Sequence, residues 1–143
     1  MSVPLLLAHG DDGFGLDQVL RAFAERIGAD ERVEIVAERS PDEPAIDRAR
    51  VEAGTVGMFG VHLAVLRQPL RAAGRSTAAT DRLTALVRDL PDGAALALVE
   101  LRSTRDATRP PPLLGRLADA VVTRGGVVEE RQAPRRGELQ AWV

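Results

Sequence analysis

The chain opens with Val3-Pro-Leu-Leu-Leu-Ala-His-Gly-Asp-Asp-Gly-Phe14. The almost continuous apolar run from Val3 to Ala8 is typical of a central strand that is buried on both faces of a parallel sheet. From Phe14 onward, apolar residues recur at the three- and four-residue spacing of an amphipathic helix, which should stop near Gly28. A strand, a tight turn and a helix form the start of a β–α–β unit, so this segment predicts an α/β fold.

The rest of the chain repeats this alternation of strand and helix. Further strands are expected at Arg32–Glu38, His62–Leu66, Ala94–Leu101 and Val127–Arg131, with helices between them over 40–53, 77–90 and 113–122. Parallel strands need crossover connections, which helices supply. The sequence therefore predicts three layers, α/β/α, around a five-stranded, mainly parallel sheet.

Local signals place some of these elements more closely. Ala94–Leu101 is the most apolar candidate strand and should lie centrally, whereas Arg32–Glu38 should lie nearer an edge. Ser40, followed by a Pro and then a Glu, is expected to cap the second helix. Ser76 or its neighbour should cap a later helix, and Gln68–Arg75 is expected to be a polar connection.

Composition excludes several kinds of chemistry. With 143 residues, no cysteine and two histidines, the chain is expected to be one domain without disulfides, thiolate catalysis or Cys/His metal clusters. All 19 basic residues are arginine, so no lysine is available to bind phosphate or form a Schiff base. The net charge of −2 favours protein partners over bare DNA. No apolar run is long enough for a membrane span and no signal peptide is visible, so a cytoplasmic location is expected.

The loop after the first strand is where an open parallel sheet would bind a nucleotide. It reads His9-Gly-Asp-Asp-Gly-Phe-Gly-Leu-Asp-Gln18 and matches neither a P-loop nor a Rossmann fingerprint. Asp11 and Asp12 would also repel a phosphate at the helix N-terminus. We expect these two carboxylates to cap a helix. We expect no bound cofactor and no metal site.

Two carboxylate alternatives remain open from the residues alone. Asp11 and Asp12 could hold Mg²⁺ in a phosphoacceptor (receiver) domain, but the chain offers Arg67, Glu100 and Arg131 near the positions where that site needs Asp, Ser or Thr, and Lys. Glu100 could also act like the acidic residue of a Walker B strand. Without a phosphate loop, a strand-end carboxylate is the simpler interpretation.

Glycines at 54, 57 and 60 interrupt the segment before the third strand, just where Val56, Met58 and Phe59 come together. Large apolar side chains on an irregular connection need an explanation. One hypothesis is that they fill the edge of the core. The other is that they form an exposed anchor for a partner protein. His62, which follows, is expected to be a strand-entry side chain and not a catalytic base.

Four segments together resemble the N-terminal domain of the delta subunit of the bacterial DNA polymerase III clamp loader. They are Leu5–Phe14, Val56–Gly60 with the strand Leu63–Leu66, Leu90–Val99, and the terminal Glu138–Val143. The resemblance spans nearly the whole chain. Two positions depart from the usual pattern: Gly13 stands where a Glu is common, and Val61-His62 replaces the polar residue or Arg that often follows the apolar motif.

The resemblance implies a RecA-like AAA+ domain, within the P-loop NTPase class, that lacks a functional P-loop. It implies a protein that binds the sliding clamp (the beta subunit) and helps to open the ring for loading onto DNA during replication, as part of a DNA polymerase holoenzyme. Neighbouring clamp-loader subunits would hydrolyse ATP, and primed DNA would be contacted through the assembled complex. The clamp-binding residues it implies are Val56, Met58 and Phe59, and it implies no catalytic site.

On this basis residues 1–136 are expected to form the AAA+-like domain, and residues 137–143 to begin a helix leading into a following domain. A different class of function stays open beside the interaction module: a nucleotide-binding or phosphoryl-transfer α/β enzyme with a degenerate phosphate loop. Exposure of Met58 and Phe59 favours the first, and an ordered nucleotide at Gly10–Gly15 the second.

Overall fold

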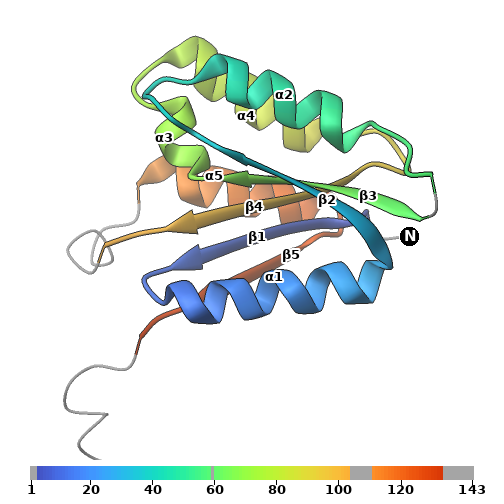
Figure 1. The fold of residues 1–143 in the computed structure, drawn as a ribbon. Coiled ribbons are helices and arrows are strands. Elements are labelled where there is room, and N and C mark those ends of the chain that lie inside the picture. The colour runs from blue at the N-terminus through green and yellow to red at the C-terminus, as the bar shows by residue number, and fades with distance from the viewer. Residues whose placement is uncertain (1–2, 59, 104–110, 134–143) are drawn as a thin grey trace, which may run out of the picture.

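The computed structural model describes residues 3–58, 60–103 and 111–133. These residues form five strands and five helices, with one helix between consecutive strands except between the third and fourth strands, where there are two; Figure 1 shows their arrangement. In chain order they are β1 (Leu5–Gly10), α1 (Gly13–Ile27), β2 (Ala29–Val36), α2 (Glu43–Ala53), β3 (Val61–Arg67), α3 (Pro69–Ala73), α4 (Thr77–Arg88), β4 (Ala95–Leu101), α5 (Pro112–Thr123) and β5 (Val127–Arg131). The predicted α/β class is confirmed.

All five strands are parallel and lie in the order β2-β3-β4-β1-β5. The apolar strands β1 and β4 are therefore inside the sheet and β2 is at an edge, as the sequence predicts. In the register between β1 and β4, His9 lies opposite Glu100 and Gly10 opposite Leu101. This order is neither the Rossmann order, 3-2-1-4-5-6, nor the flavodoxin-like order, 2-1-3-4-5.

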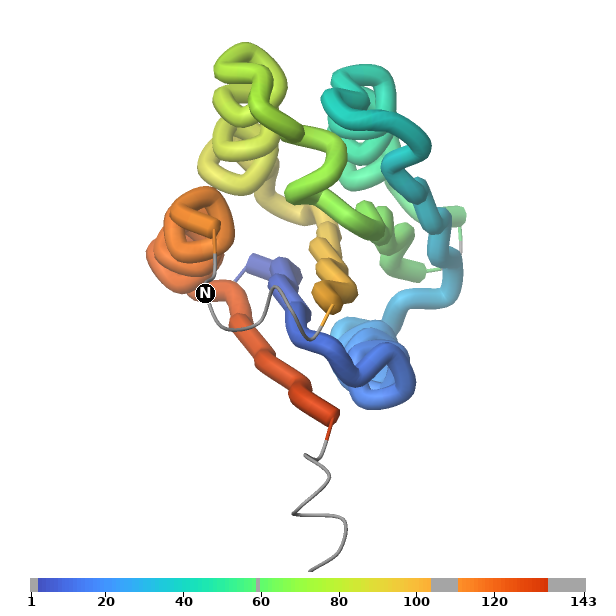
Figure 2. The backbone as a smooth tube through the Cα atoms, turned by 90° about the vertical axis from the view of Figure 1, so that its left-hand side faces the viewer, coloured from blue at the N-terminus to red at the C-terminus, as the bar shows by residue number. Residues whose placement is uncertain are grey.

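The order explains how the helices divide between the two faces of the sheet. The step from β1 to β2 crosses the sheet in one direction, and the steps from β2 through β3 and β4 to β5 cross it in the other. Since crossovers between parallel strands are right-handed, α1 covers one face and the later helices cover the opposite face (Figure 2). The expected three layers are present, with one helix in one layer and four in the other.

Each face has its own apolar core. On the α1 face, Leu16, Leu20 and Phe23 pack against alternate residues of the central strands. On the other face, residues of α2, α3, α4 and α5 pack together over the remaining strand residues, with Ile46, Leu83 and Leu117 among those completely buried. Because buried core residues come from every element except β5, whose Val127 and Val128 pack against them partly buried, the sheet gives its connecting loops a rigid base.

The structure corrects two local expectations. The N-cap of α2 is Asp42 and not Ser40: the Asp42 carboxylate accepts hydrogen bonds from the backbone N–H of Ala45 at 3.1 Å and of Glu38 at 2.9 Å. Each carboxylate oxygen accepts one of these bonds, so Asp42 serves both the first turn of α2 and the segment that follows β2. The other expected cap is confirmed, since Ser76 accepts from the Ala79 N–H at 3.1 Å.

The second correction concerns Gln68–Arg75, which is not simply a polar connection. It contains the short helix α3, whose residues Pro69, Ala72 and Ala73 are buried. A buried Ala does not signal itself in hydropathy as a Leu does, so the apolar side of this turn is hard to see in the sequence. Within the described residues, no helix is both long enough and apolar enough to cross a membrane.

Candidate partner-binding loop at the amino edge of the sheet

The connection between α2 and β3 lies at the amino edge of the sheet, on the right in Figure 1. Two of its apolar side chains point into solvent: Val56 is 89% exposed and Met58 is 82% exposed. These values contradict the hypothesis that Val56 and Met58 fill the edge of the core. Phe59, the third predicted anchor residue, lies outside the described residues. Whether the loop binds a clamp stays a prediction.

Backbone and hydroxyl hydrogen bonds tie the start of this loop to the last turn of α2. The Gly54 N–H donates to the Arg50 carbonyl at 3.2 Å, and the Thr55 hydroxyl donates to the Val51 carbonyl at 2.8 Å. At the other end the chain doubles back tightly. A Cβ on Gly57 would collide with the carbonyl oxygen of Gly60. Close backbone approach thus requires a glycine at 57, and a Cβ on Gly60 would collide with the Asp30 side chain, whereas Gly54 has room for one.

His62 anchors the base of the loop. Its ring is only 8% exposed and lies between two carboxylates, with Nδ1 2.9 Å from Glu31 Oε2 and Nε2 2.8 Å from Glu52 Oε2. The hydrogen bond to Glu31, opposed by burial and helped by Glu52, raises the pKa of His62. Both ring nitrogens face acceptors, so the imidazolium form, which donates from both, satisfies the site. The prediction of a strand-entry side chain is confirmed, and the residue has a structural task as well.

Glu31 extends this anchor to the loop itself. Its hydrogen bond to His62 lowers the pKa of Glu31, and a hydrogen bond from the backbone N–H of Met58 acts in the same direction. The carboxylate therefore joins β2, β3 and the residue that carries an exposed anchor side chain. Sequence analysis missed this cluster, because Glu31 and Glu52 come from different elements and meet His62 only when the sheet forms.

The carboxyl edge of the sheet is the other place to look for a site. Strands β1 and β4 are neighbours whose chains leave to opposite faces, into α1 and toward α5, and such a switch point is where open α/β sheets bind ligands. Here it is bridged by a backbone hydrogen bond from the Arg102 N–H to the Gly10 carbonyl at 2.8 Å.

The N-terminus of α1 at this edge is closed by its own side chain. The Asp12 carboxylate accepts from the Gly15 N–H at 3.0 Å, and a Cβ on Gly15 would approach Asp12 Oδ2 to 2.5 Å. Asp11 instead accepts from the Ala133 N–H at 2.7 Å. The expected capping role is thus confirmed for Asp12, while Asp11 fastens the chain that follows β5. A carboxylate lies where a phosphate would need the helix N–H groups.

Glu100, the possible Walker B residue, is 4% exposed and already partnered. It accepts from the Leu70 N–H and from the Gln68 side-chain amide, each at 2.8 Å. Burial raises the pKa of Glu100 to about 7, although the hydrogen bond from the Leu70 N–H and the charge of Arg102 oppose the shift. Its carboxylate caps the first turn of α3. This supports the interpretation as a strand-end carboxylate.

The receiver-domain alternative fails on the strand order, because receiver domains have the flavodoxin-like order. The residue at the phosphoacceptor position also has the wrong charge for that role. Arg67, where the phosphoacceptor Asp would be, donates to Glu34 at 2.6 Å and to Asp17 at 3.2 Å. Among the described residues, no group of three or more His, Asp or Glu side chains is arranged to hold a metal ion.

Comparisons with known proteins add little to this geometry. No protein-family model matches the chain, and no curated protein sequence matches it. Among solved structures, the chain is similar to a chain of the Drosophila ORC bound to DNA, with 13% identity and a TM-score of 0.44 over 93% of this chain and 26% of that one. It is also similar to a chain of the Drosophila ORC bound to GC-rich DNA and Cdc6, with 12% identity and a TM-score of 0.44 over 96% of this chain and 53% of the other.

Proposed function

We propose that this chain is the N-terminal, RecA-like AAA+ domain of a clamp-loader delta subunit, which binds the sliding clamp and helps to open its ring. The observation that carries the proposal is the exposure of Val56 and Met58 on a glycine-bounded loop whose base is fixed by His62. These are the positions that the sequence resemblance assigns to clamp binding. Phe59 belongs to the same anchor on the evidence of that resemblance.

The physical logic is that of an interface hot spot. An exposed apolar side chain costs free energy in water, and a loop keeps such side chains when a partner buries them. Met adapts to an irregular pocket, and an adjacent aromatic ring adds area at one point. Because the base of the loop is held by hydrogen bonds, less conformational entropy is lost on binding than with a free loop.

The proposed role is one of protein interaction, without ATP hydrolysis by this domain. Two features support this part: the Asp12 carboxylate caps the helix N-terminus that would hold a phosphate, and the chain has no lysine. ATP hydrolysis would belong to neighbouring clamp-loader subunits. Contact with primed DNA would come through the assembled complex, in keeping with the net charge of −2 of this chain.

The alternative function is a nucleotide-binding or phosphoryl-transfer enzyme with a degenerate phosphate loop. The α/β fold with its switch point between β1 and β4 is the one observation in its favour. It would need the Asp12 cap to open and the Arg102–Gly10 hydrogen bond to break before a phosphate could enter.

Affinity for a bacterial sliding clamp tests the proposal. Phe59→Ala should weaken binding by about 2–4 kcal/mol, which is roughly thirtyfold to a thousandfold in Kd, if this ring is a hot-spot residue. Phe14→Ala is the matched control, because Phe14 is 74% exposed at the start of α1, at the opposite edge of the sheet. Binding by the parent that is weakened by the first change and not by the second supports the proposal. No measurable binding by the folded parent, or equal losses in both variants, would reject it.

A further inference from the structure

Helices α2 and α4 lie side by side on the same face of the sheet (Figure 2), and side-chain contacts close the seam between them along part of its length. In the closed part, Arg82 of α4 pairs with Asp47 of α2, with Nη1 2.8 Å from Oδ2 and 3.0 Å from Oδ1. Glu43 adds a longer contact to the same guanidinium, at 3.8 Å. One helical turn further along, toward the amino edge, Arg50 and Leu86 occupy the corresponding positions.

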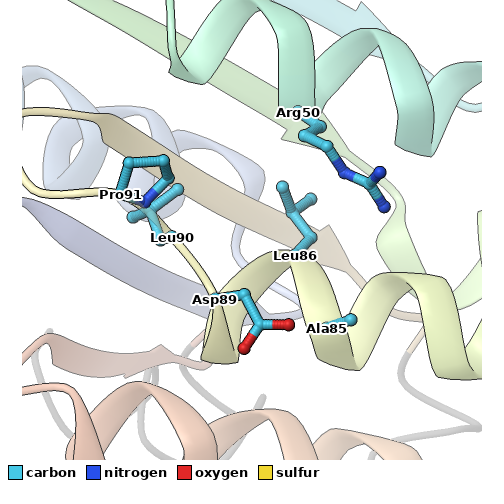
Figure 3. A pocket seen from close by; sticks show the side chains of 6 residues that line it. All are labelled: Arg50, Ala85, Leu86, Asp89, Leu90 and Pro91. Atoms are coloured by element: carbon cyan, nitrogen blue, oxygen red, sulfur yellow. The ribbon is translucent and has the colours of Figure 1, made fainter.

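There the seam opens into a cavity of about 280 Å³ (Figure 3). Apolar side chains make most of its wall, and its charged residues are Arg50 of α2 and Asp89, the C-cap of α4. The lining residues are Arg50, Ala85, Leu86, Asp89, Leu90 and Pro91. A dry cavity of roughly 150 Å³ is enough to hold a benzene ring, so this one has room for a large apolar side chain.

The two charged residues differ in how they are satisfied. Asp89 has a cation beside it, with its Oδ1 3.5 Å from Arg88 Nε. Arg50 has no ion pair with any residue in the described ranges 3–58, 60–103 and 111–133. In Figure 3, Leu86 separates the Arg50 side chain from that of Asp89. The site therefore complements an apolar group that carries an anion on its Arg50 side.

One lining residue of this cavity, Arg50, is hydrogen-bonded to the start of the proposed clamp-binding loop. Arg50 lies in the last turn of α2, and its carbonyl accepts the Gly54 N–H with which the loop begins. Val51, beside it, is 68% exposed. Exposed apolar side chains therefore lie close to the cavity in the chain, at Val51 in the last turn of α2 and at Val56 and Met58 in the loop that follows.

We propose that the partner that receives the loop also inserts a side chain of its own into the α2–α4 cavity. The inserted segment carries a large apolar residue next to a carboxylate, which pairs with Arg50. This inference rests on the proposed function and adds a second contact to it: the loop enters a pocket on the sliding clamp, and the clamp fills the cavity in return. Two contacts in opposite directions fix the orientation of the domain on the ring, which one loop alone cannot do.

Clamp affinity of two further variants tests this inference. Arg50→Glu replaces attraction by repulsion and should weaken binding about tenfold, with a smaller effect at high salt. Ala85→Leu fills the cavity from a half-buried position and should also weaken binding about tenfold. Arg116→Glu is the control for net charge, since Arg116 is an exposed residue of α5, and it should leave the affinity unchanged. Melting curves of all variants confirm that they are folded.

The outcomes separate this inference from the function on which it rests. If Phe59→Ala weakens clamp binding while Arg50→Glu and Ala85→Leu both bind as the parent does, the cavity is not part of the interface and the inference is wrong, although the function stands. If Arg50→Glu and Arg116→Glu weaken clamp binding equally, the effect is one of net charge and the inference is again rejected. If the parent shows no affinity for the clamp, the function fails and the inference fails with it.

Discussion

Replacing Met58 by Ala should separate binding from folding. Met58 is 82% exposed, so little of its side chain contributes to the stability of the isolated chain. The same side chain is free to be buried by a partner. Met58→Ala is therefore expected to leave the fold almost unchanged and to weaken clamp binding clearly.

The magnitudes follow from the exposed fraction. Complete burial of a Met side chain stabilises by about 1.5–3 kcal/mol, so burying the 82% that is exposed contributes about 1.2–2.5 kcal/mol to binding. This corresponds to roughly a sevenfold to sixtyfold change in Kd. The buried remainder is worth at most about 0.5 kcal/mol of stability, or roughly 2 °C in melting temperature. A core residue would instead lose about 2–5 kcal/mol, and roughly 8–20 °C.

Two assays on the same samples check this prediction: thermal unfolding followed by circular dichroism, and titration calorimetry against a bacterial sliding clamp. Leu86→Ala is a useful reference for unfolding, because Leu86 is 3% exposed and should show the larger loss of a core residue. If Met58→Ala lowers the melting temperature as much as Leu86→Ala, the reasoning from exposure is wrong. If it is as stable as the parent and binds the clamp equally well, Met58 is not an anchor.

Two further predictions concern the cluster around His62 and the loop after β1. The folded-state pKa of His62 is raised above its ordinary value of 6.5, so its contribution to stability is complete below about pH 6.5 and is lost as the pH rises through the folded value. The pKa of Glu31 is lowered from 4.5, so its contribution is present above about pH 4.5 and is lost as the pH falls through the folded value. The melting temperature of His62→Gln should therefore fall furthest below that of the parent near pH 5.5 and approach it as the pH rises through the folded-state pKa of His62; a difference that stays constant as the pH is raised would contradict the charged cluster. Titration calorimetry with Mg-ATP should give no micromolar affinity, because the Asp12 carboxylate occupies the N-terminus of α1; micromolar binding that disappears in Gly15→Ala would instead favour the enzyme alternative.

Hydropathy patterns were sufficient to predict the architecture. The apolar runs of β1 and β4 and the stripe of α1 are long and regular, and their burial dominates the free energy of folding. The residues that the patterns did not place are those whose partners are distant in the chain. Asp42 caps α2 in place of Ser40 because it also bonds Glu38, and the buried alanines of α3 become apolar contacts only when β4 and α4 lie beside them.

The candidate site was also predictable only in part. The glycine spacing pointed to an irregular, projecting segment, and the exposure of Val56 and Met58 agrees with it. The supports of that segment were not predictable, because the three residues of the His62 cluster lie on β2, α2 and β3 and meet only in the folded sheet. The α2–α4 cavity was not predictable from the sequence for the same reason. The cavity lies beyond the part of the α2–α4 seam that the Arg82–Asp47 ion pair closes. No local sequence pattern shows how two helices pack against each other.

Hydrogen–deuterium exchange with and without a bacterial sliding clamp tests the central claim most directly, because it locates the partner surface without any substitution. The account predicts that added clamp slows exchange of the backbone amides at residues 54–60 and at the end of α2, while those at residues 10–15, at the opposite edge of the sheet, exchange as before. Protection confined to residues 10–15, or an exchange pattern that the clamp leaves unchanged at concentrations up to the solubility limit, would contradict the claim that this loop is the clamp-binding element.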